Sequence, residues 1–156
     1  MTRYLPEGKL INTKDNERVI NSLCLLKEAQ LSKTILEAKA VICDNEHNLI
    51  VDLGLMKGII PRIEGAVGIK EGTVRDIAVI SRVNRPVCFI VTGFTEENGE
   101  TVAVLSRAKA QQMCIDNYVS RLTCGDVVDA RIARLGGFGA VADIGCGVVS
   151  LMPIDA

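Results

Sequence analysis

Six cysteines and one histidine are the residues best suited to metal or redox chemistry in this sequence of 156 residues. No two cysteines form a Cys-x-x-Cys pair, and His47 is the only histidine. A zinc site takes about four Cys or His ligands, usually supplied in closely spaced pairs. We therefore expect reduced thiols that pack as small apolar side chains, with no bound metal and no cofactor. The cysteines are Cys24, Cys43, Cys88, Cys114, Cys124 and Cys146.

Two aspartates stand at matching positions and are the strongest candidates for acid–base catalysis. Asp52 lies in the run Leu-Ile-Val-Asp-Leu-Gly, and Asp143 lies in the run Ala-Val-Ala-Asp-Ile-Gly. Catalysis needs a second carboxylate, a histidine or a nucleophile, and no such residue accompanies the aspartate in both copies. An aspartate followed by glycine also ends a strand and forms a tight turn, in which glycine adopts a positive φ. We favour the turn interpretation and expect no enzymatic activity.

Charge and composition limit the classes of partner. The net charge is −1, whereas a protein that contacts many phosphates of a duplex is usually basic. Aromatic residues make up only 3% of the chain, so few rings are available to stack on bases. Any nucleic-acid contact must therefore come from a local patch. The N-terminus does not resemble a signal peptide and no apolar run is long enough to span a membrane, so we expect a cytoplasmic protein without membrane contact.

The apolar pattern changes its period along the chain and predicts successive parts. Residues 1–33 combine a polar arm with a helix from about residue 16 to 32. The apolar stripe of this helix either packs on the following domain or docks a partner, and we favour packing. Residues 34–105 are rich in short Val/Ile segments typical of a β domain. Residues 106–122 favour a connecting helix capped by a serine. Strand composition resumes in residues 123–156.

The β domain contains five strand segments separated by turn residues. Asn98-Gly99 is the expected tip of a hairpin, and the stretch from Val74 to Pro86 holds one or two helical turns or part of a strand. We expect these five strands to form a closed barrel. The segments lie within 35–43, 49–53, 59–63, 88–92 and 101–105.

The C-terminal segments repeat the first part of the β domain, at a spacing of about ninety residues. They supply three strands, in 127–135, 139–144 and 148–154, whereas a five-stranded barrel needs two more. Three explanations are open: the chain is part of a longer protein, another chain completes the sheet, or the sheet packs on the first barrel. An exposed half-barrel is prone to aggregate. We expect residues 123–156 to be completed by a second copy, as a homodimer, or to be poorly ordered.

Several motifs occur in a consistent order. They are Lys57-Gly58-Ile59-Ile60-Pro61, Val104-Leu105-Ser106-Arg107-Ala108-Lys109-Ala110, Gly125-Asp126-Val127-Val128 and Gly136-Gly137-Phe138-Gly139-Ala140. Together with the repeated Asp-x-Gly runs they are similar to the RNA-binding repeat family of bacterial ribosomal protein S-one, in particular its first two tandem repeats. The resemblance implies a mostly β fold: a five-stranded oligonucleotide-binding (OB) barrel with an N-terminal helix, a connecting helix and the first three strands of a second OB repeat.

The resemblance also implies a function. OB barrels of this family bind single-stranded RNA on the face of strands two and three, in translation or RNA metabolism on the small ribosomal subunit. The family's aromatic positions are mostly lost here, and only His47 and Phe138 retain a ring. Docking on a ribosomal or other protein is therefore the alternative, and a small-ligand barrel is a third, weaker one. The candidate RNA-binding residues are His47, Lys57, Arg62, Arg82, Arg85, Arg131, Arg134 and Phe138.

Each of these candidates also has a plainer interpretation. His47 and Phe138 serve equally well as turn or packing residues, and single arginines usually lie on a solvated surface. Arg82 and Arg85 form the best local cluster for a phosphate. Arg131 and Arg134 lie three residues apart on a predicted strand, so we expect them to point to opposite faces.

Overall fold

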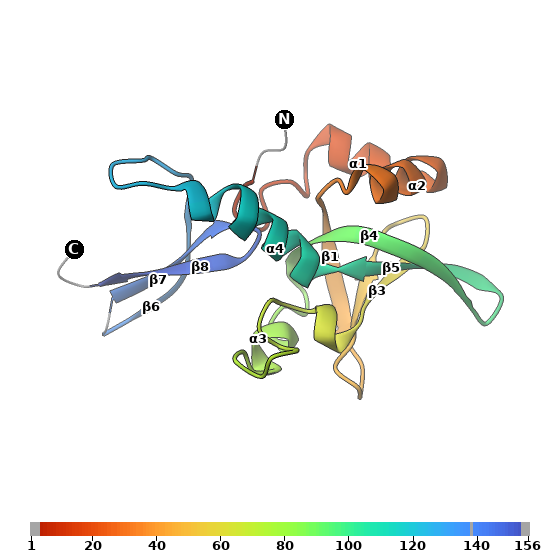
Figure 1. Ribbon diagram of the computed structural model, residues 1–156. Coiled ribbons are helices and arrows are strands. Elements are labelled where there is room, and N and C mark those ends of the chain that lie inside the picture. Colours follow the sequence, from red (N-terminus) through yellow and green to blue (C-terminus); the bar gives the residue numbers. More distant parts are fainter. Residues whose placement is uncertain (1–3, 138, 154–156) are drawn as a thin grey trace.

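A computed structural model describes residues 4–137 and 139–153 (Figure 1). Two helices, α1 (Lys14–Ile20) and α2 (Leu23–Ser32), precede the first strand. The prediction of one continuous helix is wrong, because the Ser22 hydroxyl accepts the N–H of Leu25 and starts a new helix. Leu26 of α2 is fully buried in the core of the first sheet, so the prediction that this segment packs on the β domain is confirmed.

The first sheet is a closed barrel with the strand order β1-β2-β3-β5-β4. Neighbouring strands are antiparallel except β3 and β5, which run parallel. The prediction of five strands in residues 34–105 is confirmed, as is the hairpin at Asn98-Gly99, where both residues have positive φ. The strands are β1 (Leu36–Cys43), β2 (Leu49–Asp52), β3 (Lys57–Ile60), β4 (Pro86–Glu97) and β5 (Glu100–Ser106).

Alternate side chains of these strands fill the barrel. The largest is Phe89, which is completely buried among leucine, isoleucine and valine side chains. The connection from β3 to β4 contains a 3-10 turn, η1 (Arg62–Glu64), and one helical turn, α3 (Ile77–Ile80), which confirms the helical alternative predicted for this stretch. Val79 of α3 inserts into the same core, so the connection closes one end of the barrel.

A second, smaller sheet follows the barrel. Ser106 accepts the N–H of Lys109 and caps the predicted connecting helix, α4 (Arg107–Asn117), which is followed by η2 (Val119–Arg121). Three antiparallel strands then form a sheet in the order β6-β7-β8. Helix α4 lies between this sheet and the barrel (Figure 1). The strands are β6 (Arg131–Gly136), β7 (Gly139–Gly145) and β8 (Val148–Pro153).

The small sheet repeats the strand pairing of β1, β2 and β3. In both sheets the first two strands are offset by one extra residue, a β-bulge, at the same place in the ladder. The third strand also pairs with the second in the same register. The internal repeat seen in the sequence is therefore present in the structure. The equivalent cross-strand pairs are Lys39–Asp52 and Arg131–Asp143, Ile42–Ile50 and Arg134–Val141, and Ile59–Ile50 and Leu151–Val141.

The bulge in β6 contradicts one prediction. Arg131 and Arg134 were expected on opposite faces because they are three residues apart. Their cross-strand partners, Asp143 and Val141, are only two residues apart. Because directly opposed residues share a face, and so do residues two apart in one strand, both arginines project from the same face.

The small sheet packs against its own chain. The N–H of Cys146 donates to the carbonyl of Leu5 at 2.9 Å, and the Cys146 side chain is buried against α4 and β4. The ring of Tyr4 also stacks on Tyr118, with centroids 6.0 Å apart. Packing on the first barrel, one of the three explanations considered, is therefore observed. Within the described residues no strand pairs with the outer edges of β6 and β8, and their completion by a second copy stays a prediction.

Candidate nucleic-acid interface

The outer face of β2 and β3 is aliphatic in the middle and polar at its ends. Ile50 and Ile59 are opposed and half-buried, and Ile42 beside them is 57% exposed. Asp52 and Lys57 form the next opposed pair, and both are exposed. This face offers apolar contact area and one lysine, with no ring on which a base could stack.

The structure brings two of the predicted RNA-binding residues together at one end of this face. Asp76, which precedes α3, lies 2.6 Å from His47 Nδ1 and 2.9 Å from Arg62 Nε. The Arg62 N–H donates to the Asn48 side chain at 2.8 Å. Hydrogen bonds from Arg62 and His47 hold the pKa of Asp76 below its usual range. The result is a half-exposed cluster of one arginine, one carboxylate and one imidazole beside the β1–β2 turn.

His47 itself is a turn residue, as its plainer interpretation proposed. Its φ is +64°, and its N–H donates to the carbonyl of Asp44. Its ring nevertheless remains 42% exposed, so it can still contact a ligand. Lys57 lies at the other end of β3, where its ammonium group is 3.7 Å from the carboxylate of Glu97. These residues therefore line one face without converging on a single point.

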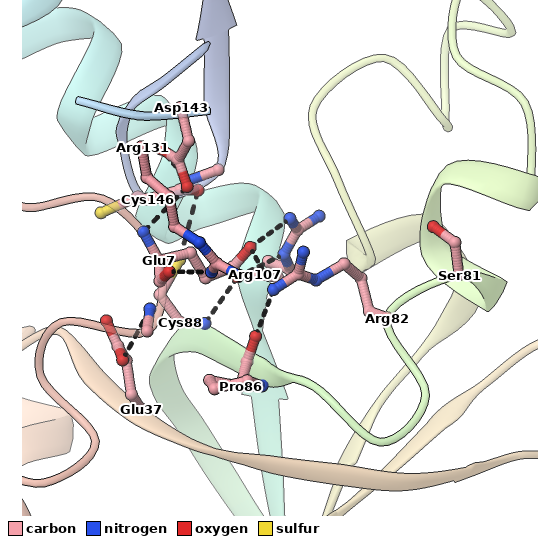
Figure 2. Close-up of polar contacts among 12 residues, drawn as sticks. Glu7, Glu37, Ser81, Arg82, Pro86, Cys88, Arg107, Arg131, Asp143 and Cys146 are labelled. Atoms are coloured by element: carbon pink, nitrogen blue, oxygen red, sulfur yellow. Dashed lines mark hydrogen bonds and ion pairs between the residues drawn. The ribbon is translucent and has the colours of Figure 1, made fainter. Parts of the chain in front are cut away.

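Arg82 and Arg131 turn inward, to a buried network centred on Glu7 that the sequence did not reveal (Figure 2). Glu7 is only 1% exposed. Its carboxylate accepts hydrogen bonds from Arg107 Nε at 2.8 Å and Arg107 Nη2 at 2.7 Å, and Arg82 Nη2 lies 3.2 Å away. The backbone N–H of Cys88 in β4 donates to the same carboxylate at 2.8 Å.

The backbone of Glu7 joins the network to the small sheet. Its N–H donates to Asp143 of β7 at 2.8 Å, and its carbonyl accepts from Arg131 Nη1 of β6 at 3.0 Å (Figure 2). Arg107 also donates to the carbonyl of Gly65 in the β3–β4 connection. One residue of the N-terminal arm thus links the barrel, α4 and the small sheet.

Glu7 and Arg107 form a buried ion pair. Burial opposes ionisation of Glu7, but the charges of Arg107 and Arg82 outweigh it and lower the pKa of Glu7 below its usual range. Burial likewise disfavours the charged form of Arg107, and Glu7 more than compensates by raising the pKa of Arg107. A pair of this kind is costly to break, because either partner alone would be an unpaired buried charge.

A second buried carboxylate holds the N-terminal arm to the barrel. Glu37 Oε1 accepts the N–H groups of Gly8, Leu10 and Ile11 at 3.0 to 3.1 Å. Burial raises the pKa of Glu37 to about 7, against the opposing effect of the Leu10 hydrogen bond. The polar N-terminal arm is therefore held to the barrel by Glu37 as well as by Glu7.

Both repeated aspartates accept backbone N–H groups near turns, but the turn interpretation is confirmed in full only for Asp52. Asp143 lies within β7, and Gly145 is not among the glycines with a positive φ. Asp52 Oδ1 accepts the N–H of Gly54 at 2.7 Å. Asp143 Oδ1 accepts the N–H groups of Gly145 at 2.9 Å and Gly147 at 3.1 Å. Gly54 and Gly147 both have a φ of +78°.

Three of the six cysteines meet at the junction between the barrel and the small sheet. Cys88, Cys114 and Cys146 share one buried cluster, and the Cys88 thiol donates to the Cys146 carbonyl at 3.3 Å. Cys24 and Cys124 are exposed, and all six thiols are free. Among the described residues, no group of three or more His, Cys, Asp or Glu side chains is arranged to hold a metal ion.

The remaining candidates lie apart from the β2–β3 face. Arg85 is exposed at the start of β4, beside Arg82. Arg134 is exposed on β6. Phe138 lies outside the described residues.

Comparison with known proteins gives no family assignment. No protein-family model matches the chain, and no curated protein matches it at a significant level. No helix in the described part of the chain is long and apolar enough to cross a membrane.

Proposed function

We propose that the chain is a non-enzymatic, OB-type protein of the S-one class that binds single-stranded RNA on the outer face of β2 and β3. The observation that carries this proposal is the closed five-stranded barrel with the order β1-β2-β3-β5-β4. OB barrels place their oligonucleotide site on strands two and three and on the adjoining β1–β2 and β4–β5 loops. By the resemblance described above, the setting is translation or RNA metabolism, on the small ribosomal subunit in the cytoplasm.

The side chains of this face support a modest, sequence-tolerant RNA site. Arg62 at one end and Lys57 at the other offer cations for phosphates of the same strand, and the half-exposed ring of His47 lies beside Arg62. Ile50 and Ile59 between them offer apolar contact but no stacking. Base–aromatic stacking is worth about 1–3 kcal/mol per base, so we expect weaker binding than that of an OB barrel rich in aromatic residues.

Docking on a protein is the second candidate, and two features favour it. The half-buried Ile50 and Ile59, with the exposed Ile42 of β1 beside them, replace rings on the β2–β3 face, and an apolar patch of this kind is typical of a protein contact. The β4–β5 hairpin projects beyond the barrel and carries the exposed carboxylates Glu96, Glu97 and Glu100 (Figure 1). A negative hairpin repels RNA phosphates and complements a basic protein surface.

Fluorescence anisotropy with a labelled single-stranded RNA, over a series of salt concentrations, separates the two candidates. If RNA binds this face, affinity falls with salt, and Lys57→Gln and Arg62→Gln each reduce the salt slope by about 0.7. Lys27→Gln, on the exposed side of α2, is the matched control and leaves the slope unchanged. Absence of salt-dependent RNA binding, together with binding to small ribosomal subunits, would instead favour docking.

A further inference from the structure

We propose that the cleft between the barrel and the small sheet binds a phosphate ester with an apolar or planar body, such as a nucleotide, and that Arg85 and Arg82 hold its phosphate. None of the residues that line this cleft belongs to β2 or β3. The inference therefore concerns a second site and does not rest on RNA binding by the β2–β3 face.

The cleft has the size and lining of a small-molecule site. Its volume is about 450 Å³, within the range of roughly 300–1,000 Å³ found for ligand pockets. The β3–β4 connection forms one wall, α4 a second and the β7–β8 hairpin a third. Most lining side chains are aliphatic, including Val74, Ala78, Ile115 and Val149. Val149 is 55% exposed, so the body of a ligand would cover apolar surface that now faces solvent.

The charges in the cleft leave a positive excess. Three arginines line it together with two carboxylates, Glu7 and Asp143. The Glu7 carboxylate is occupied by Arg107, by Arg82 and by the N–H of Cys88. The Asp143 carboxylate is occupied by three backbone N–H groups. Both carboxylates therefore keep their partners when an anion enters the cleft, and in the described part of the chain Arg85 forms no ion pair with a carboxylate.

Arg82 supplies a donor without a partner. Its Nη2 is engaged by Glu7 and by the carbonyl of Pro86, but its Nε is buried and donates to no described residue. A buried donor that makes no hydrogen bond costs free energy, and a bound phosphate oxygen would remove that cost. Burial, together with the charges of Arg107 and Arg85, lowers the pKa of Arg82 against the opposing effect of the Glu7 charge, so a bound anion would stabilise its charged form.

Arg85 is the residue to alter, because it is exposed and its side chain supports no other described contact. Arg75→Gln is the matched control: Arg75 is an exposed arginine in the same connection, and it does not line the cleft. The probes are AMP, adenosine and inorganic phosphate, titrated into the full chain by isothermal titration calorimetry. A hydrogen bond to a charged group is worth about 1.5–3 kcal/mol, so Arg85→Gln should weaken AMP binding by about tenfold or more.

The expected result is that AMP binds, that phosphate competes with it, that adenosine binds much less well, and that only Arg85→Gln weakens AMP. A 5′-phosphorylated RNA oligonucleotide, compared with its 5′-hydroxyl form, identifies the source of the phosphate. Preference for the phosphorylated oligonucleotide over AMP assigns an RNA end, and the reverse assigns a free nucleotide. The proposal is overturned if neither AMP nor the phosphorylated oligonucleotide binds at ~1 mM, or if both arginine variants weaken binding equally. RNA binding that depends on Lys57 but not on Arg85 would overturn this site and leave the proposed function intact.

Discussion

Replacing Glu7 by glutamine should destabilise the protein and loosen the small sheet first. Glutamine keeps the shape and one acceptor, but it removes the charge that balances Arg107, which is only 5% exposed. Removing one partner of a buried ion pair costs about 3–5 kcal/mol, a large part of a total stability of roughly 5–15 kcal/mol. We expect a loss near 3 kcal/mol, because the amide oxygen still accepts from Arg107 or from the N–H of Cys88.

Urea unfolding followed by circular dichroism measures this loss, and Glu71→Gln is the matched control. Glu71 is exposed, so its neutralisation should change the free energy of unfolding by less than about 0.5 kcal/mol. Hydrogen exchange then locates the effect. Amides of β6, β7 and β8 should lose protection before those of β1 to β5, because the Glu7 side chain anchors to Arg107 the segment whose backbone bonds to β6 and β7. A loss for Glu7→Gln no larger than the control, or equal loss of protection in both sheets, would refute this role of Glu7.

Three further predictions concern the same junction. The pKa of Glu37 is about 7 in the folded chain and 4.5 ordinarily, so the unfolded chain releases this proton first and the free energy of unfolding should fall by about 2.5 kcal/mol from pH 5 to pH 8. Urea titrations at both pH values should show that Glu37→Gln removes this fall, and an unchanged pH dependence would contradict it. Gly147→Ala should destabilise the protein more than Gly72→Ala, although both glycines have a φ of +78°. A Cβ at Gly147 would lie 2.5 Å from Arg107 Nη2, whereas a Cβ at Gly72 would meet nothing within 4 Å. Equal melting temperatures of the two variants would show that the close approach at Gly147 is unimportant. Cys24 and Cys124 should be alkylated first in the native protein, and mass spectrometry showing a buried cysteine modified equally fast would contradict the packing of the junction.

The strands were predictable because their signals are local. Short apolar segments between turn residues mark the eight strands of the described residues, and the turn at Asp52 and Gly54 could be recognised from its chemistry. The bulge in β6 was not predictable, because a single extra residue such as Ala133 has no mark in the sequence, and it reversed the expected relation between Arg131 and Arg134. The break between α1 and α2 was overlooked although Ser22 is a good N-cap, because the apolar stripe continues across it.

The junction could not be found from the sequence, because its partners are far apart along the chain. Glu7 and Arg107 are separated by 100 residues, and an isolated glutamate beside proline and glycine gives no indication of burial. For the same reason two of the eight candidate RNA contacts, Arg82 and Arg131, proved to be engaged with Glu7. The clustering of His47 with Arg62 depends on Asp76 in the connection between β3 and β4, which is 29 residues from His47 and 14 from Arg62 in the sequence.

The most direct test of RNA binding through β2 and β3 is a titration of ¹⁵N-labelled protein with a short single-stranded RNA, followed by NMR. The predicted result is that the largest amide shifts cluster in β2, β3 and the turn that contains His47, and that they diminish as salt is added. The RNA-binding assignment would be contradicted if saturating RNA left those amides unshifted, or if shifts appeared only in α1, α2 or the small sheet.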